Sequence, residues 1–323
     1  MFKKIPALLL ALLFITAIFS GCGDNTTAQI EKVVVVLDYT PNTNHTGLYA
    51  AKDLGYYAEV GLDVEIIQPP EDGALALVAT GRADFAVSYQ EEIMVAATSA
   101  QPLPIKAIAA LIEHNTTGLI SLKERGINRF KDLEGKKLAT WQIPIYDEII
   151  LECVRADGGD PEKVTLIPNN ATDVISGIRN EFDAMWVYEG WDKTIADING
   201  VENTYISFTS VNPVFDYYTP ALVTNNNTLE NKAELVKKFL DATEKGYTYA
   251  KENHKEAADI FIKSVPEVDA DTVYASQEYL SGQYFSTKWG YIDESRWNAF
   301  ANWMKEKGFI ESSDTVCFAN PER

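Results

Sequence analysis

Short apolar runs alternate with longer amphipathic stretches along most of the chain. Runs of about five residues bounded by polar residues are typical of buried strands, and stretches with helical spacing that stop at glycine are typical of helices. On this pattern we predict strands at residues 33–37, 62–67, 83–87, 105–112, 118–122, 164–167, 182–187, 205–208 and 219–224, and one more within 130–140. Strands and helices that alternate at this spacing predict an α/β fold with parallel strands.

The spacing becomes mainly helical after residue 229. We predict helices at residues 232–253, 254–262, 272–280 and 295–307 in this part, and shorter ones between the strands at 47–54, 74–80, 93–99, 146–157 and 171–180. Residues 82–91 and 181–189 also share a pattern, in which a strand is followed by an aromatic residue next to amide or carboxylate groups. Two similar lobes would bring these strand ends together across a cleft, and such interfaces are favoured ligand sites.

Residues 1–21 have the layout of a secretory signal peptide. Two lysines precede an apolar core at residues 7–19, which is short for a membrane span. Two small residues then precede Cys22, a pattern similar to the lipidation site of bacterial lipoproteins. We expect a lipid anchor on Cys22 and a flexible tether at residues 22–31. An ordinary cleaved signal peptide followed by an incidental cysteine is the alternative.

The chain is acidic, with a formal net charge of -19. This charge argues against nucleic acid or an anionic membrane surface as the partner of the folded part. Cys153 and Cys317 are either small buried residues or partners in a disulfide. The sequence has no CxxC pair and no histidine and cysteine cluster with metal-ligand spacing, so we predict no metal and no cofactor.

The loop at residues 38–47 joins the first predicted strand to the first predicted helix. It contains five threonine and asparagine side chains, which suit turns and helix N-caps, and Pro41, which cannot donate to a strand ladder. One helix needs only one N-cap, so these side chains exceed what a turn requires. Ligands of open α/β sheets bind at the carboxyl ends of strands. We therefore predict a ligand site here, with a simple turn and cap as the alternative.

Several stretches resemble one known family. They are residues 37–49, 51–57, 61–64, 81–85, 130–137, 186–191 and 216–220. In them the chain resembles the extracytoplasmic solute-binding proteins of ABC importers, which have a type II periplasmic-binding-protein fold, and within that class the thiamin-pyrimidine-precursor group. The Pro-Asn-Thr-Asn-His-Thr-Gly loop is typical of this group, whereas Gly-Arg-Ala-Asp-Phe and Asp-Leu-Glu-Gly-Lys also occur in wider relatives. The family more often has tryptophan where this chain has Tyr39.

This resemblance implies two lobes, each a mixed, mostly parallel sheet flanked by helices, with the ligand cleft between them. The first lobe would combine residues 32–117 with 223–323, and the second would cover 118–222. The protein would be a lipid-anchored monomer outside the cytoplasm that delivers a flat heteroaromatic ligand to an ABC permease. The implied ligand is a thiamin pyrimidine such as a formyl-aminopyrimidine, with riboflavin or another aromatic ring as the alternative.

A flat heterocycle needs aromatic faces for stacking and in-plane donors and acceptors for its nitrogens. The candidates for the faces are Tyr39, Tyr89, Trp141, Tyr188, Trp191 and Tyr217. The candidates for the edges are Asp38, Asn42, His45, Gln90, Glu91 and Glu189. A carboxylate can accept from an exocyclic amine and share a proton with a ring nitrogen, and we assign this role first to Glu189 and second to Glu91. Core packing is the alternative for any single aromatic residue.

His45 matches the position at which the eukaryotic pyrimidine synthase of this family carries a histidine that supplies atoms to the product. That branch also has an iron-binding cysteine cluster, which this sequence lacks. We therefore predict a binding protein, in which His45 hydrogen-bonds the ligand or its own loop; the enzyme and a receptor's sensor domain are the alternatives. His114 and His254 are expected to have no special role.

Overall fold

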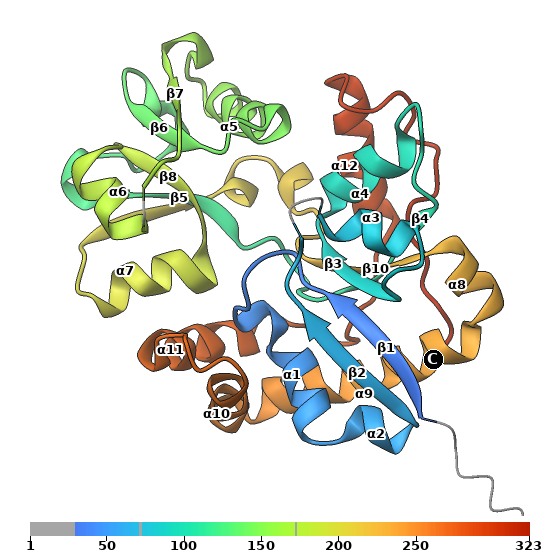
Figure 1. Cartoon of the computed structure of the whole chain (residues 1–323). Coiled ribbons are helices and arrows are strands. Elements are labelled where there is room, and N and C mark those ends of the chain that lie inside the picture. Colours follow the sequence, from blue (N-terminus) through green and yellow to red (C-terminus); the bar gives the residue numbers. More distant parts are fainter. Residues whose placement is uncertain (1–29, 71–72, 172) are drawn as a thin grey trace, which may run out of the picture.

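The computed structural model describes residues 30–70, 73–171 and 173–323. The predicted signal peptide, Cys22 and most of the predicted tether lie outside the described residues. The described chain forms two lobes, each built on a five-stranded sheet (Figure 1). No helix within the described ranges is both long enough and apolar enough to cross a membrane.

The first sheet combines the N-terminal strands with one strand that returns late in the chain. Its order is β2-β1-β3-β10-β4. β1 pairs in parallel with β2 and β3, whereas β10 is antiparallel to β3 and β4. The strands are β1 (Glu31–Val36), β2 (Leu62–Ile67), β3 (Phe85–Ser88), β4 (Ile105–Ala110) and β10 (Ala221–Asn225).

The second sheet has the order β7-β6-β8-β5-β9. β6 is parallel to β7 and β8, and β5 is antiparallel to β8 and β9. The strands are β5 (Thr117–Leu122), β6 (Lys137–Thr140), β7 (Thr165–Pro168), β8 (Ala184–Tyr188) and β9 (Asn203–Ser207). Both sheets are mixed, as predicted, but the prediction that they are mostly parallel is wrong. Among the described strands each sheet has as many antiparallel as parallel pairs, because β10 and β5, which follow the crossovers between the lobes, pair antiparallel on both sides.

Helices cover both faces of the first sheet. Because strand residues alternate in direction, Val33 and Val35 face one layer of helices, and Val34 and Val36 face the other. The first layer is α1 (Thr46–Asp53), α2 (Tyr56–Glu59) and α9 (Ala233–Glu252), and the second is α3 (Ala74–Ala79), α4 (Gln90–Thr98) and α12 (Glu294–Glu306). The remaining helices of this lobe are α8 (Asn226–Asn231), α10 (His254–Ser264) and α11 (Ala270–Ser281).

Helices also flank the sheet of the second lobe, and α11 of the first lobe lies against this lobe beside α7 (Figure 1). Its helices are α5 (Pro144–Ala156), α6 (Val174–Asn180), the π-helix η5 (Glu189–Lys193) and α7 (Thr194–Ile198). Six 3-10 helices are also described: η1 (Thr43–His45), η2 (Lys123–Arg125), η3 (Phe130–Leu133), η4 (Pro161–Lys163), η6 (Phe208–Ser210) and η7 (Pro213–Phe215). α6 begins later than predicted because the Asp173 side chain caps it, accepting from the Ser176 N–H at 2.8 Å.

Asp216 joins the two segments that cross between the lobes. It lies in the second crossover, between β9 and β10. Its side chain accepts a hydrogen bond at 2.9 Å from the backbone N–H of Asn115, which lies in the first crossover, between β4 and β5. The Arg296 guanidinium of α12 donates to the same carboxylate at 2.9 Å, and His114 Nδ1 lies 2.7 Å from it. The expectation that His114 has no special role is therefore wrong, because the fold brings it to a carboxylate about a hundred residues away in the sequence.

The C-terminal tail runs along β4, the outer strand of the first sheet. The Ala107 N–H donates to the Cys317 carbonyl at 2.9 Å, and the Ala319 N–H donates to the Ala107 carbonyl at 2.8 Å. The tail thus continues the sheet beyond β4 for a short distance. Cys317 and Cys153 are both free and buried, so they do not form the disulfide that the sequence left open.

Candidate ligand site at the junction of the lobes

The loop after β1 fixes a hydrogen bond between Asp38 and His45. His45 is fully buried, and its Nδ1 accepts a hydrogen bond from the Asn42 N–H at 3.2 Å. With Nδ1 as an acceptor, Nε2 donates to Asp38 Oδ1 at 2.6 Å. Burial alone would raise the pKa of Asp38, but the charge and hydrogen bond of His45 and a hydrogen bond from Tyr89 together hold it below its usual value.

The rest of this loop is held by the C-terminal helices. The Tyr247 hydroxyl donates to the Asn44 carbonyl at 2.7 Å, and the Tyr284 hydroxyl donates to the Thr43 carbonyl at 3.0 Å. Asn42 caps η1, because its side chain accepts from the Asn44 N–H at 3.0 Å. Asn42 therefore has the cap role that was the alternative in the sequence. Tyr39 lies beside this framework with 66% of its surface exposed.

Glu91 lies in the first turn of α4 and is only 4% exposed. Its Oε1 accepts a hydrogen bond from the Tyr146 hydroxyl at 2.9 Å, whereas its buried Oε2 has no hydrogen-bond partner among the described residues. Burial raises the pKa of Glu91 to about 8, and hydrogen bonds from its own backbone N–H and from Tyr146 only partly oppose this. Because Tyr146 belongs to α5 of the second lobe, this bond connects the lobes.

Tyrosines from both lobes surround these two carboxyl groups. Tyr188, at the end of β8, lies near both Asp38 and Glu91, whose charges add to the effect of burial and raise its pKa. Tyr89 and Tyr217 also have pKa values raised by burial and by neighbouring groups of this cluster. Tyr217 is buried, with its ring stacked on Phe300 at 4.1 Å between centroids. The structure thus brings together residues that the sequence predicted separately from both strand ends.

Glu189 and Trp191 come from η5 and contact a different part of the first lobe. Glu189 Oε2 accepts from the Tyr279 hydroxyl of α11 at 2.8 Å, which makes a second hydrogen bond between the lobes. Trp191 is half-buried against the apolar cluster of α10 and α11, near Tyr49 and Ile262. Glu189 and Glu91 thus each accept one hydrogen bond from a tyrosine of the other lobe, and the order of the two in the predicted role stays a prediction.

Two other predicted residues differ in exposure. Gln90 is fully buried, and its side chain donates to the Trp297 carbonyl at 2.9 Å and accepts from the Tyr218 N–H at 3.0 Å. It thus holds α4 to the interior of the first lobe. Trp141 is 45% exposed, and its ring meets the edge of Tyr146 at 6.0 Å between centroids. Trp141 and Tyr146 are thus an aromatic pair of the second lobe near Glu91.

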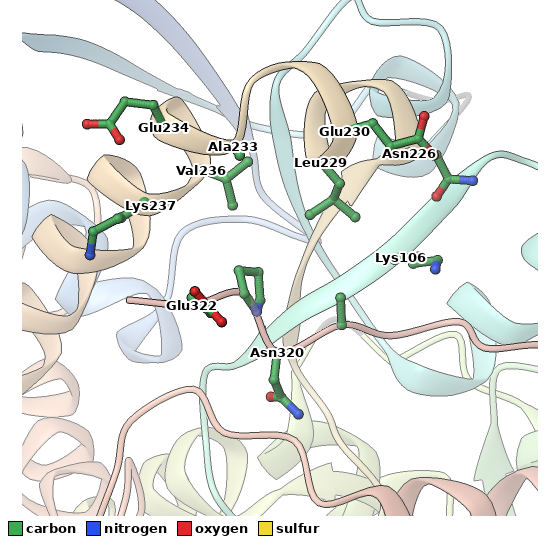
Figure 2. A pocket seen from close by; sticks show the side chains of 12 residues that line it. Lys106, Asn226, Leu229, Glu230, Ala233, Glu234, Val236, Lys237, Asn320 and Glu322 are labelled. Atoms are coloured by element: carbon green, nitrogen blue, oxygen red, sulfur yellow. The ribbon is translucent and has the colours of Figure 1, made fainter.

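A cavity of about 530 Å³ lies away from this junction, at the edge of the first lobe (Figure 2). Lys106 of β4, α8, the start of α9 and the C-terminal tail line it, and Lys237 and Glu234 extend at its rim. None of the predicted ligand-binding residues belongs to its lining. The described residues also contain no cluster of three or more histidine, cysteine or acidic side chains suited to a metal ion.

Solved structures share this two-lobed architecture. The periplasmic aliphatic sulphonate binding protein SsuA from Escherichia coli matches with a TM-score of 0.69 and 12% identity, over 91% of this chain and 93% of that one. This likeness defines the class by fold: the chain has the type II periplasmic-binding-protein fold. The predicted two-lobed α/β fold class is confirmed.

The sequence comparisons define the family within this class. Residues 42–257 match the family described as NMT1/THI5 like, and the chain belongs to this family, as predicted. A formylaminopyrimidine-binding protein of Halalkalibacterium halodurans is 29% identical over 327 residues, covering 95% of this chain and 94% of that protein. A 4-amino-5-hydroxymethyl-2-methylpyrimidine phosphate synthase of Legionella pneumophila is 28% identical over 243 residues, covering 74% of this chain and 75% of that protein.

Proposed function

We propose that this protein is the solute-binding component of an ABC importer and that it binds a thiamin pyrimidine precursor such as a formyl-aminopyrimidine. The observation that carries the proposal is the junction of the lobes, where hydrogen-bonding carboxyl groups lie among tyrosines from both sides. Asp38 and Glu91 supply in-plane hydrogen bonds, and Tyr188 supplies an aromatic face. The relative named as a formylaminopyrimidine-binding protein, which matches almost the whole chain, supports this ligand class.

The proposed ligand lies between the lobes and draws them together. Tyr89, Tyr188 and Trp141 face the flat ring, and Tyr39, which is exposed, covers it from the first lobe. Domain closure of this kind is common in periplasmic binding proteins. The closed protein then presents a surface from both lobes to a membrane permease. In this proposal the chain is exported as a monomer and remains outside the cytoplasm, held by a lipid on Cys22.

The geometry of His45 supports binding over synthesis. Both ring nitrogens are engaged inside the protein, Nδ1 with the Asn42 N–H and Nε2 with Asp38. The side chain is fully buried, so a reaction that consumes the ring would have to dismantle the loop. We therefore infer that His45 orients Asp38 toward the ligand. One relative is named as a pyrimidine phosphate synthase. Iron-dependent pyrimidine formation by the purified protein would therefore contradict this role of His45.

The test is a titration of the protein lacking residues 1–22 with a ligand panel, followed by calorimetry and thermal unfolding. The panel contains a formyl-aminopyrimidine, the corresponding hydroxymethylpyrimidine, thiamin, riboflavin, an aliphatic sulfonate and aliphatic amino acids. A ligand that binds only the folded state stabilises it by about 2.7 kcal/mol at one hundred times its Kd. We expect the aminopyrimidine to give the largest rise in Tm. A rise with riboflavin alone would identify the alternative ligand, and a rise with sulfonate alone would contradict the proposal.

A matched pair of variants locates the binding. Tyr188→Leu removes an aromatic face at the junction and is expected to weaken aminopyrimidine binding about tenfold, since an aromatic stack is worth about 0.5–1.5 kcal/mol beyond its buried area. Tyr274→Leu removes a tyrosine that is 41% exposed on α11, and is expected to leave the affinity unchanged. Equal affinities for both variants would place the ligand elsewhere.

A further inference from the structure

Glu91 has an unused hydrogen-bonding atom inside the proposed binding site. Its Oε1 accepts from the Tyr146 hydroxyl at 2.9 Å, and its Oε2 is buried without a partner. A buried polar atom that lacks a partner costs roughly 1–3 kcal/mol, and native proteins rarely leave one without a purpose. Because Tyr146 belongs to the other lobe, the Glu91 carboxyl group lies at the junction where the proposed ligand would bind. The first question is whether this oxygen accepts or donates a hydrogen bond.

The backbone N–H of Glu91 and the Tyr146 hydroxyl favour a negative charge on this carboxyl group, but burial outweighs both. On its own helix the neighbour is Glu92, which bears a like charge. From the second lobe and the crossover, the facing groups are Tyr146, Tyr188 and Tyr217, which are neutral hydroxyls. Within the described part of the chain, no ion pair involves Glu91. A carboxyl group buried without a cation takes up a proton rather than remain charged.

We propose that Glu91 is a neutral carboxylic acid in the free protein and that its Oε2–H donates to an unprotonated ring nitrogen of the ligand. The carbonyl oxygen Oε1 keeps its bond from Tyr146 and has a second lone pair for an adjacent exocyclic amine. The acid thus matches a ring nitrogen beside an amino group, which is the edge of an aminopyrimidine. A protonated ring nitrogen cannot accept a hydrogen bond from Oε2–H, so Glu91 favours a ligand whose ring is neutral. This inference rests on the proposed function for the identity of the ligand.

The protonation is measured first, without any ligand. Infrared difference spectra at pH 7 compare the wild type with Glu91→Gln and with the matched control Glu92→Gln. We expect the carbonyl band of a neutral carboxylic acid in the wild type and in the control, and its loss in Glu91→Gln. We also expect this band to disappear when the pH is raised from 7 to 9, because burial raises the pKa of Glu91 to about 8. A wild type without the band at pH 7 would overturn the proposal.

The ligand contact is measured next, by calorimetry with a formyl-aminopyrimidine at pH 7 and pH 9. If only the acid form binds, the apparent Kd of the wild type rises about tenfold, since about one tenth of the protein remains protonated at pH 9. Glu91→Gln keeps a donor and an acceptor, so its Kd should stay within about threefold of the wild type at pH 7 and should not change with pH. A Glu91→Gln variant that is weakened equally at both pH values would show that an ionised Glu91 accepts, and would overturn the proposal.

Two further results keep the inference separate from the proposed function. If the acid band is present but no aminopyrimidine binds, the proposed ligand and its contact with Glu91 are both wrong, whereas the measured protonation is not. If Glu91→Gln does not fold, Tyr146→Phe provides the second test. The hydrogen bond from Tyr146 lowers the pKa of Glu91, so Tyr146→Phe should move the loss of the acid band to higher pH. A band lost at lower pH in this variant would overturn the proposal.

Discussion

The end of β1 and the start of α4 each place a buried carboxyl group at the junction of the lobes. The side chain of Asp38 is 5% exposed and has His45 Nε2 at 2.6 Å, and its pKa lies below the usual value because His45 and Tyr89 outweigh the effect of burial. Glu91 is 4% exposed and accepts from the Tyr146 hydroxyl rather than from a histidine, and burial raises its pKa to about 8. Asp38 and Glu91 are buried to a similar degree, so their different hydrogen-bonding partners account for the opposite directions of their pKa shifts.

This difference gives the site two kinds of hydrogen-bonding group from the same chemistry. An ionised Asp38 can only accept hydrogen bonds, whereas a neutral Glu91 can donate one. Opposite pKa directions in neighbouring groups are a common sign of separate roles in a functional site. The two regions also respond to pH in opposite ways. Asp38 contributes stability that is lost as the pH falls below its usual pKa, and Glu91 contributes stability that is lost as the pH rises toward its raised pKa.

Removing the partner of Asp38 should have the largest effect. His45→Ala leaves a buried carboxylate without its pair, and breaking such a pair costs about 3–5 kcal/mol. Urea unfolding at pH 7 measures this loss against His254→Ala, a histidine at the start of α10, which we expect to change stability by less than about 0.5 kcal/mol. If the uncompensated charge is the cause, adding Asp38→Asn should restore a large part of the loss. A single variant as stable as the wild type would show that His45 does not hold the charge.

The pH dependence of stability separates the two carboxyl groups. Between the ordinary pKa of 4.5 and the folded value of about 8, Glu91 is protonated in the folded state and ionised in the unfolded chain. The free energy of unfolding should therefore fall by about 1.4 kcal/mol per pH unit from this group. Glu91→Gln should remove this slope, and Asp38→Asn should remove only the loss at acidic pH. A slope that persists in Glu91→Gln would assign it to other groups.

The support of the Asp38 loop can be disturbed by one methyl group. A Cβ on Gly47 would lie 2.3 Å from ring carbons of Tyr247, whose hydroxyl holds the Asn44 carbonyl. We expect Gly47→Ala to destabilise the protein by about 1–3 kcal/mol, because a packed core resists added volume. The control is Gly282→Ala, whose new Cβ would make an ordinary contact at 3.6 Å. Thermal unfolding of both variants gives the comparison, and equal Tm values would mean that the loop adjusts freely.

The smallest effects should come from the two hydrogen bonds between the lobes. Tyr146→Phe removes the donor to Glu91, and Tyr279→Phe removes the donor to Glu189. Each should cost about 1 kcal/mol in the free energy of unfolding. The variants differ in pH dependence, because Tyr146→Phe should shift the slope due to Glu91 to higher pH while Tyr279→Phe leaves it in place. Unfolding measured from pH 5 to pH 9 distinguishes them, and identical profiles would contradict a specific Tyr146–Glu91 bond.

Much of the fold follows from local patterns in the sequence. The apolar run that forms β1 and the long amphipathic stretch that forms α9 were predicted within one or two residues of their observed bounds. The antiparallel half of each sheet was not predicted, because the direction of β10 and β5 depends on crossovers between lobes rather than on strand composition. The contacts of Asp216 with His114 and Asn115 were not predicted either, because these partners are about a hundred residues away in the sequence.

The candidate site was predictable where it follows strands and less so where it lies on helices. The loop after β1 and the end of β8 carried visible clusters of polar and aromatic residues. Tyr146 was missed because it lies in a helical pattern, where one tyrosine gives no sign of the group it will meet across the junction. The order of Glu189 and Glu91 likewise depends on tertiary contacts, since only the fold shows that Tyr279 binds Glu189.

The C-terminal tail covers part of an edge strand through which two copies of the protein could otherwise associate. β4 is the outer strand of the first sheet, and an open outer strand can recruit a strand from another molecule and start aggregation. The backbone of residues 317–319 occupies part of that edge through its bonds with Ala107. A chain shortened before Cys317 would leave the backbone N–H and carbonyl of Ala107 unpaired. We therefore expect it to self-associate at concentrations at which the full chain does not. The last few residues thus cover part of a sheet edge that a second chain could otherwise pair with.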